Sequence, residues 1–186
     1  MNIVKFLIEY FKSPKTIGAV APSSQRLAER MVNDIDFDNA KCIVEYGPGT
    51  GVFTDKLVKR KKEDTLLVLI EYNIKFCEEL KNRYNIYGNI VIINDSAENV
   101  DKHLEKYNIK NVDYVVSGLP FASLPKDIST RILNNTRNIL KKKGKFITFQ
   151  YTLVKKQFIE KYFSKIELNR VVLNVPPAYV FKCENS

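Results

Sequence analysis

The sequence contains one histidine, three cysteines and no tryptophan among its 186 residues. Histidine-rich zinc sites and Ser-His-Asp triads both need imidazole groups, and His103 is the only one that the chain offers. We therefore predict no metal site, and we expect His103 to lie on the solvated face of a helix.

Long apolar runs and a secretory leader are also missing. No run is long enough to span a bilayer as a helix, and Lys5 and Glu9 interrupt the apolar positions of the N-terminus. Cys42, Cys77 and Cys183 are far apart in apolar surroundings, which indicates reduced core residues. These features predict a cytoplasmic protein, and 45% hydrophobic content predicts a single domain over residues 1–186.

Acidic residues are fewer than basic ones. The chain has 21 Asp and Glu against 30 Lys and Arg, a formal net charge of +9. This excess favours an anionic partner, and nucleic acid and an anionic membrane surface both fit. The densest basic runs, 59–62 and 141–145, are predicted to be solvated helix ends, where the helix dipole favours cations.

Glycine is scarce, but three of the seven glycines stand at alternate positions of one turn. The apolar run 42–44 predicts a buried strand before the turn, and the amphipathic run 52–62 predicts a helix after it. Glycine lets a ligand lie against the backbone, and the helix points its free amide groups at the same place. The third glycine comes one residue too early for the dinucleotide fingerprint G-x-G-x-x-G. We predict a nucleotide-type cofactor site formed by Glu45, Gly47, Pro48, Gly49, Thr50 and Gly51.

Three later apolar runs also end in polar or glycine residues. The run 65–70 ends at Glu71, about 20 residues after the glycines, where related folds place the acceptor for ribose hydroxyls. The run 90–94 leads to Asp95, which in this fold can accept the adenine amino group, and the run 112–116 leads to Ser117. Because the carboxyl ends of parallel strands share one edge of a sheet, we expect one site there. Its other predicted members are Tyr72, Ser96, Ala97, Gly118, Leu119, Pro120 and Phe121.

Helical and strand patterns alternate along the chain. Further helices are predicted at 73–84, 97–107, 124–142 and 154–163, a fifth strand at 146–151, and a closing hairpin from 166–175 and 178–183. This order predicts an α/β fold with a mostly parallel seven-stranded sheet, helices on both faces and a C-terminal antiparallel hairpin.

The N-terminal segment 2–12 has the pattern of an amphipathic helix with a narrow polar arc. It fits a helix packed on the domain, and it equally fits an interfacial helix half buried among lipid headgroups. The apolar loop that follows, 16–24, is expected to lie over the ligand edge of the sheet. Ser23 or Ser24 is predicted to cap a helix at 25–33.

Blocks at 18–24, 45–54, 70–73, 117–121, 149–151 and 174–178 resemble the bacterial phospholipid N-methyltransferases, and the likeness runs over nearly the whole chain. Gly-Ala-Val-Ala-Pro-Ser-Ser at 18–24 and Ser-Gly-Leu-Pro-Phe at 117–121 are its more specific parts. The resemblance implies a Rossmann-like class I methyltransferase that uses S-adenosylmethionine to methylate the amine of a phospholipid such as phosphatidylethanolamine. It also implies peripheral association with anionic membranes through the N-terminal helix.

The resemblance extends the predicted site. Ser23, Ser24 and Ser117 join the cofactor-binding residues, and the segment 117–121 becomes the catalytic loop together with Tyr10 and Tyr151. A lipid ammonium must lose a proton before it attacks. The carbonyls of Ser117 or Gly118 and the hydroxyls of Tyr10 and Tyr151 are the expected acceptors around the amine, and no strong general base stands out. Positioning of the amine is the main expected catalytic device.

Two alternatives stay open. The related rRNA adenine dimethylases carry Asn-Leu-Pro-Tyr where this chain has Gly118-Leu119-Pro120-Phe121. Gly118 lacks the acceptor that an asparagine offers to a planar adenine amine, which counts against RNA without removing it. Phe121 can face a base, a choline-like head or the sulfonium methyl. The other alternative is a protein that binds S-adenosylmethionine without catalysis, and the sequence does not define the oligomeric state.

Overall fold

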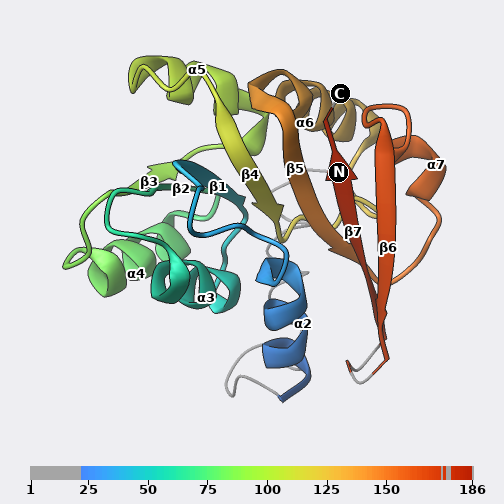
Figure 1. Cartoon of the computed structure of the whole chain (residues 1–186), viewed down its shortest axis with the longest axis horizontal. Coiled ribbons are helices and arrows are strands. Elements are labelled where there is room, and N and C mark those ends of the chain that lie inside the picture. The colour runs from blue at the N-terminus through green and yellow to red at the C-terminus, as the bar shows by residue number, and fades with distance from the viewer. Residues whose placement is uncertain (1–21, 173, 175–176, 186) are drawn as a thin grey trace.

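The structure, a computed structural model, describes residues 22–172, 174 and 177–185 (Figure 1). Its centre is a seven-stranded sheet in the order β3-β2-β1-β4-β5-β7-β6. The parallel strands are β1 (Cys42–Tyr46), β2 (Leu66–Glu71), β3 (Ile90–Asn94), β4 (Val112–Ser117) and β5 (Leu140–Gln150). β7 (Ala178–Glu184) pairs antiparallel with both β5 and β6 (Lys165–Val171). The predicted fold class is confirmed, whereas the predicted helix 2–12, with Tyr10, lies outside the described residues.

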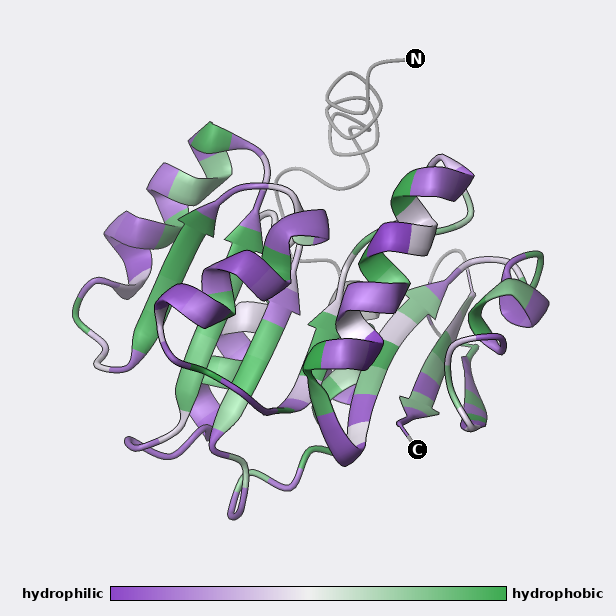
Figure 2. Cartoon of the chain, turned by 90° about the horizontal axis from the view of Figure 1, so that it is seen from above, coloured by the Kyte–Doolittle hydropathy of each residue, from purple (hydrophilic) through white to green (hydrophobic). Residues whose placement is uncertain are grey.

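Helices cover both faces of this sheet (Figure 1). One face carries α2 (Pro22–Val32), α3 (Val52–Arg60) and α4 (Ile74–Tyr84), and its core includes Met31, Leu57 and Leu80. The other face carries η1 (Ala97–Asn99), α5 (Val100–Lys106), α6 (Lys126–Ile139) and α7 (Lys156–Ile159). Figure 2 shows the result, with hydrophobic strands between helices whose outward faces are hydrophilic. None of the described helices is long and apolar enough to cross a membrane.

The helix α2 starts earlier than the sequence predicts. It begins at Pro22, because proline suits the first helical position, where its missing N–H costs nothing. Ser23 and Ser24 therefore lie within the helix, and the prediction that they precede and cap it is wrong. Their side chains are outside what the structure describes.

The basic run 141–145 belongs to a strand and not to a helix end. α6 stops at Ile139 and β5 starts at Leu140, so the predicted helix 124–142 is too long. Lys143 N donates to Asn185 O over 3.2 Å, and Asn185 N donates to Gly144 O over 2.9 Å. This pairing with the C-terminal segment overrides the local helical signal. The predicted helix 154–163 is likewise reduced to the single turn of α7.

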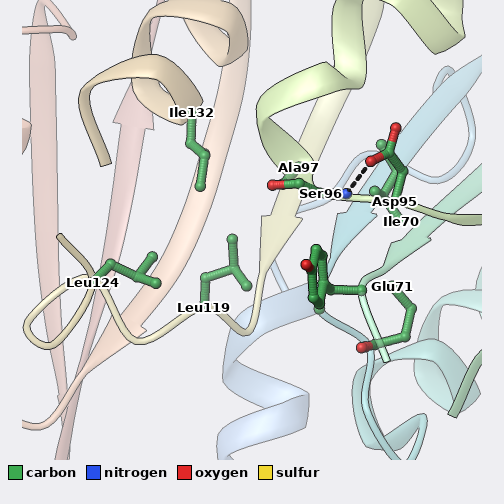
Figure 3. A pocket seen from close by; sticks show the side chains of 10 residues that line it. Ile70, Glu71, Asp95, Ser96, Ala97, Leu119, Leu124 and Ile132 are labelled. Carbon is green, nitrogen blue, oxygen red and sulfur yellow. Dashed lines mark hydrogen bonds between the residues drawn. The ribbon is translucent and has the colours of Figure 1, made fainter. Parts of the chain in front are cut away.

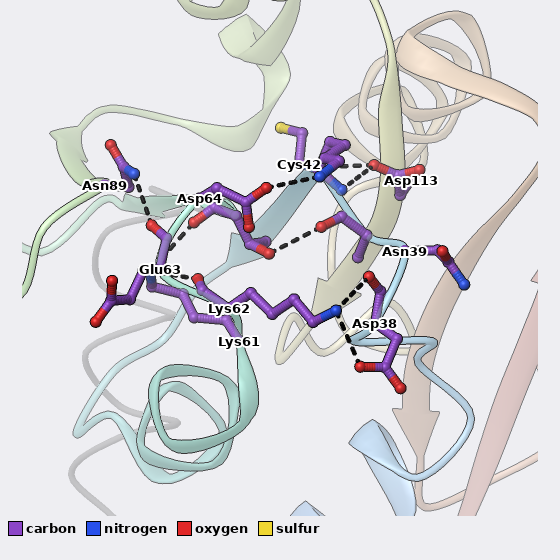
Figure 4. Close-up of polar contacts among 12 residues, drawn as sticks. Asp38, Asn39, Cys42, Lys61, Lys62, Glu63, Asp64, Asn89 and Asp113 are labelled. Atoms are coloured by element: carbon purple, nitrogen blue, oxygen red, sulfur yellow. Dashed lines mark hydrogen bonds and ion pairs between the residues drawn. The ribbon is translucent and has the colours of Figure 1, made fainter.

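The amino edge of the sheet, where the parallel strands begin, carries a network of ion pairs and polar contacts (Figure 4). Lys41 pairs with Asp64 over 2.6 Å and Lys62 pairs with Asp38 over 3.1 Å. Oδ2 of Asp113 accepts hydrogen bonds from the backbone N–H groups of Lys41 and Cys42, both over 2.9 Å. Lys62, which follows the end of α3, is thus engaged within the protein.

Candidate active site

A pocket lies at the carboxyl edge of the sheet, where the parallel strands end (Figure 3). Residues from four strand ends meet there, as the sequence predicts for a parallel sheet. The predicted members that line it are Gly47, Glu71, Tyr72, Asp95, Ser96, Ala97 and Leu119. Ile70, Leu124 and Ile132 complete the lining with apolar surface that sequence reasoning did not assign to the site.

Glu71 is fixed at the wall of this pocket by the backbone around it. Its Oε2 accepts from Gly49 N over 2.9 Å, and its Oε1 accepts from Asn73 N over 2.7 Å. Burial raises the pKa of the carboxyl, and hydrogen bonds from the backbone of Asn73, Gly49 and Tyr72 oppose that rise. The side chain therefore ties the glycine turn to the end of β2, and each oxygen keeps a lone pair for a ligand hydroxyl.

Asp95 is held from three sides. Its Oδ2 lies 2.6 Å from Nε2 of His103, and its Oδ1 accepts from Ser96 N over 2.7 Å and from Asn99 Nδ2 over 3.1 Å. Burial raises the pKa of Asp95, but the hydrogen bonds from His103, Ser96 and Asn99 outweigh it, so the pKa falls below its usual value. His103 is half-buried, so its predicted place on a solvated helix face is wrong.

The glycine turn presents backbone to the pocket at its first glycine. Gly47 has φ +61°, and a Cβ there would lie 2.8 Å from Cδ2 of Leu119. Pro48, Gly49, Thr50 and Gly51 do not line the pocket. Gly49 reaches the site through its hydrogen bond to Glu71, whereas the Thr50 carbonyl accepts from Nη1 of Arg83 over 2.8 Å. The later residues of the turn thus shape the loop.

Glu45 is a fully buried residue two positions before Gly47, the first glycine of the turn. Its Oε2 accepts from Oγ1 of Thr54 over 2.8 Å, and its Oε1 has no hydrogen-bond partner among the described residues. Burial raises the pKa of Glu45 to about 8. Glu45 does not line the pocket, so the structure places this predicted cofactor-binding residue behind the glycine turn.

The loop after β4 approaches the glycine turn closely. A Cβ on Gly118 would lie 2.8 Å from the carbonyl oxygen of Gly47, and Gly118 N donates to Tyr46 O over 2.9 Å. Ser117 is buried: its Oγ accepts from Leu119 N over 3.2 Å, and its carbonyl accepts from Oγ1 of Thr148 over 3.3 Å. Both polar groups of Ser117 therefore already support the loop.

Phe121 and Pro120 lie away from the pocket. Phe121 is 0% exposed, and its ring meets that of Phe146 edge-on with centroids 5.9 Å apart. It therefore does not face the pocket, where it was predicted to contact a base, a choline-like head or the sulfonium methyl. Pro120 is also buried, and its carbonyl accepts from Leu124 N over 3.1 Å. Tyr151 is 38% exposed beside the ring of Phe149 at the end of β5 and does not line the pocket.

Gln150 supports the loop from β5, a role that sequence reasoning missed. Its Oε1 accepts from Ala122 N over 3.1 Å and its Nε2 donates to the carbonyl of Leu119 over 3.4 Å, while only 3% of the residue is exposed. An amide directly after the mostly apolar segment 146–149 was the signal for it. Leu124, just before α6, and Ile132, within α6, carried no such signal, because the sequence does not show whether an apolar residue packs in the core or lines a pocket.

Several known proteins are similar to this chain in sequence. A profile of the ribosomal RNA adenine dimethylase family matches residues 22–175. The ornithine lipid N-methyltransferase of Singulisphaera acidiphila is 29% identical over 180 residues, which cover 96% of this chain and 93% of that protein. Ribosomal RNA small subunit methyltransferase A of Mycoplasma capricolum is 31% identical over 112 residues, 59% of this chain and 40% of that protein. The chain therefore spans less than half the length of that rRNA enzyme.

Solved structures share the fold. The 16S rRNA methyltransferase RsmC of T. thermophilus, in complex with AdoMet and guanosine, superposes with a TM-score of 0.70 at 18% identity, over 92% of this chain and 45% of that one. A SAM-dependent methyltransferase from Aquifex aeolicus gives a TM-score of 0.67 at 14% identity, over 89% and 94% of the two chains. Fold, pocket and sequence together place the chain in the ribosomal RNA adenine dimethylase family, as an enzyme that transfers methyl groups from S-adenosylmethionine.

Proposed function

We propose that this enzyme methylates the primary amine of a lipid headgroup, such as that of phosphatidylethanolamine or of an ornithine lipid, at a membrane surface. The ornithine lipid enzyme of Singulisphaera acidiphila supports this substrate class, because its similarity covers nearly all of both chains. The rRNA relative from Mycoplasma aligns over a smaller share of each chain. Tyr10 and the helix 2–12 belong to the same proposal, as does the single domain over residues 1–186.

The residues of the pocket fit S-adenosylmethionine. Glu71 would accept the ribose hydroxyls, Asp95 would accept the adenine amino group, and Gly47 would let the ligand lie against the turn. When bound, this cofactor supplies an electrophilic methyl group.

The observation that carries the lipid proposal is the approach of Gly118 to Gly47. The related rRNA adenine dimethylases have asparagine at the place of Gly118, where its side chain can accept from the planar adenine amine. Here the Cβ of any such side chain would lie 2.8 Å from a backbone carbonyl oxygen, so the loops would have to separate. The site therefore lacks both the acceptor and the room for it.

An aliphatic amine fits a site that has apolar walls and lacks this asparagine acceptor. It is an ammonium with a pKa near ~10 by analogy with lysine, so it must lose a proton before attack. The apolar walls of Leu119, Leu124 and Ile132 favour the neutral amine, because desolvation lowers the pKa of an ammonium. The ammonium loses this proton to water, and the carbonyl of Gly118 is the proposed hydrogen-bond acceptor that orients the neutral amine, since the carbonyl of Ser117 is engaged by Thr148. The loop thus works chiefly by positioning the nitrogen.

Methylation of an RNA base is the second candidate, and family membership favours it. One experiment separates the two: incubate the protein with labelled S-adenosylmethionine and, in parallel, total bacterial lipid or total RNA. We expect label in lipids that carry a primary amine. Label confined to the RNA fraction would overturn the lipid proposal, and cofactor binding without label in either fraction would indicate a catalytically silent protein.

A further inference from the structure

Several large apolar side chains remain exposed along the carboxyl edge of the sheet, the edge that holds the pocket. They follow β2, β5 and β6, and the last two strands run to the same edge because both pair antiparallel with β7 (Figure 1). Val154 is 79% exposed and Val172 is 61% exposed. The full set at this edge is Tyr72, Ile74, Tyr151, Leu153, Val154 and Val172. These side chains extend along the edge from the end of β2 to the end of β6, an outermost strand of the sheet.

Cations at the same edge are left without acidic partners. Lys75 is the second residue of α4, Lys126 is the first residue of α6, and Lys155 follows Val154. In the described part of the chain none of these three lysines forms an ion pair; Lys155 lies over the ring of Phe158, 5.3 Å from its centroid. The edge therefore combines aliphatic surface with unneutralised positive charge.

Acidic groups near the pocket are already engaged. Asp95 is paired with His103, and Asp127 is paired with Arg131 over 3.1 Å. These acids are therefore not available to neutralise Lys75, Lys126 and Lys155.

We propose that the carboxyl edge is a docking surface for a bilayer that contains anionic lipid, with Ile74, Leu153, Val154 and Val172 entering the headgroup region. This inference rests on the proposed lipid substrate and adds a second membrane contact beside the N-terminal segment. Aliphatic burial and attraction of Lys75, Lys126 and Lys155 to acidic headgroups act together at such a surface. The pocket then faces the headgroup layer, so a lipid amine reaches it while its acyl chains stay in the membrane.

A lipid surface fits these residues better than RNA does. Single-stranded nucleic acid is held by aromatic rings that stack on bases and by a basic groove that follows the phosphates. The most exposed apolar residues of this edge are aliphatic, Val154, Val172 and Ile74, and they offer no stacking face. Insertion into an interface requires only apolar area beside cations.

The test uses the full chain and the double variant Leu153→Glu with Val154→Glu, whose side chains are exposed, so the fold is expected to persist. The matched control is Ile86→Glu, since Ile86 is 80% exposed but lies at the amino edge before β3. Cosedimentation is measured on vesicles of equimolar phosphatidylglycerol and phosphatidylethanolamine, and on pure phosphatidylcholine. Methyl transfer is measured on the mixed vesicles and on a short-chain phosphatidylethanolamine kept below its micelle concentration.

We expect the double variant to bind the mixed vesicles at least about tenfold more weakly than the parent, and to methylate their lipid at least about tenfold more slowly. Its turnover of the dissolved lipid should stay within about twofold of that of the parent. The Ile86→Glu control should match the parent in every assay. Equal vesicle binding by the double variant and the parent, with lipid still methylated, would overturn the docking surface and leave the proposed function intact. No methylation of either lipid by the parent would instead refute the proposed function, and label in RNA with no vesicle binding would identify RNA as the partner.

Discussion

Nε2 of His103 lies 2.6 Å from Oδ2 of Asp95, so the only imidazole of the chain braces an acid that lines the pocket. Asp95 is the predicted acceptor of the adenine amino group, and its orientation depends on this contact together with Asn99 and Ser96. We therefore propose that His103 positions Asp95 for cofactor binding.

His103→Ala should weaken the binding of S-adenosylhomocysteine by about 1 kcal/mol, because Asp95 loses one of its charge-assisted partners. Titration calorimetry measures the effect. Lys106→Ala on the same helix α5 is the control, since this exposed lysine makes no contact with Asp95. An affinity unchanged in His103→Ala would mean that Asn99 and Ser96 suffice to hold the carboxylate.

Glu71→Ala removes the predicted ribose acceptor together with the tie to the glycine turn. We expect cofactor affinity to fall by about 1–3 kcal/mol, as it does when a buried charged partner is lost. Glu71→Gln keeps an acceptor oxygen and should lie between the parent and Glu71→Ala. Glu78→Ala removes an exposed acid of α4 and should bind as the parent does. Equal affinities in all four proteins would reject the ribose assignment.

Gly118→Asn should disrupt the site and should not convert it into an RNA enzyme. The new Cβ meets the carbonyl of Gly47 at 2.8 Å, which predicts a loss of about 1–3 kcal/mol in unfolding free energy and a fall in cofactor affinity. Gly88→Ala is the matched control, because a Cβ on Gly88 meets nothing within 4 Å. Urea unfolding and calorimetry measure both effects. A stable Gly118→Asn variant that methylates RNA would contradict the steric account of substrate choice.

Glu45 gives the protein a pH-dependent stability. Burial raises its pKa from an ordinary 4.5 to about 8 in the folded state, so the folded protein binds a proton that the unfolded chain has lost. The resulting stabilisation is fully present below the unfolded pKa and is lost as pH rises through about 8.

Glu45→Gln cannot ionise and should therefore lose less stability than the parent between pH 5 and pH 8. The difference in unfolding free energy between the two proteins is expected to change by an amount on the order of a few kcal/mol between these pH values. Urea unfolding of the cofactor-free protein at both pH values checks this, with Glu105→Gln on the surface of α5 as the control. Parallel pH profiles of the parent and Glu45→Gln would show that Glu45 is ionised in the folded state throughout.

The sequence by itself determined the strands β1 to β4, the glycine turn and the acids that follow β2 and β3. Each of these features depends on local pattern: a short apolar run, a stop signal and a polar residue at the carboxyl end. Parallel pairing then brings those ends to one edge, so Gly47, Glu71 and Asp95 line one pocket, as predicted.

Only the tertiary structure decided the features that depend on partners distant in the sequence. The lysine run of β5 is a strand because the backbone of Asn185 pairs with it, and His103 turns inward because Asp95 accepts its hydrogen bond. Phe121 packs against Phe146 in the core, and Gly118 lies against Gly47 where two loops meet. No local pattern reports such contacts, because their free energy depends on which distant groups the folded chain brings within a few ångströms.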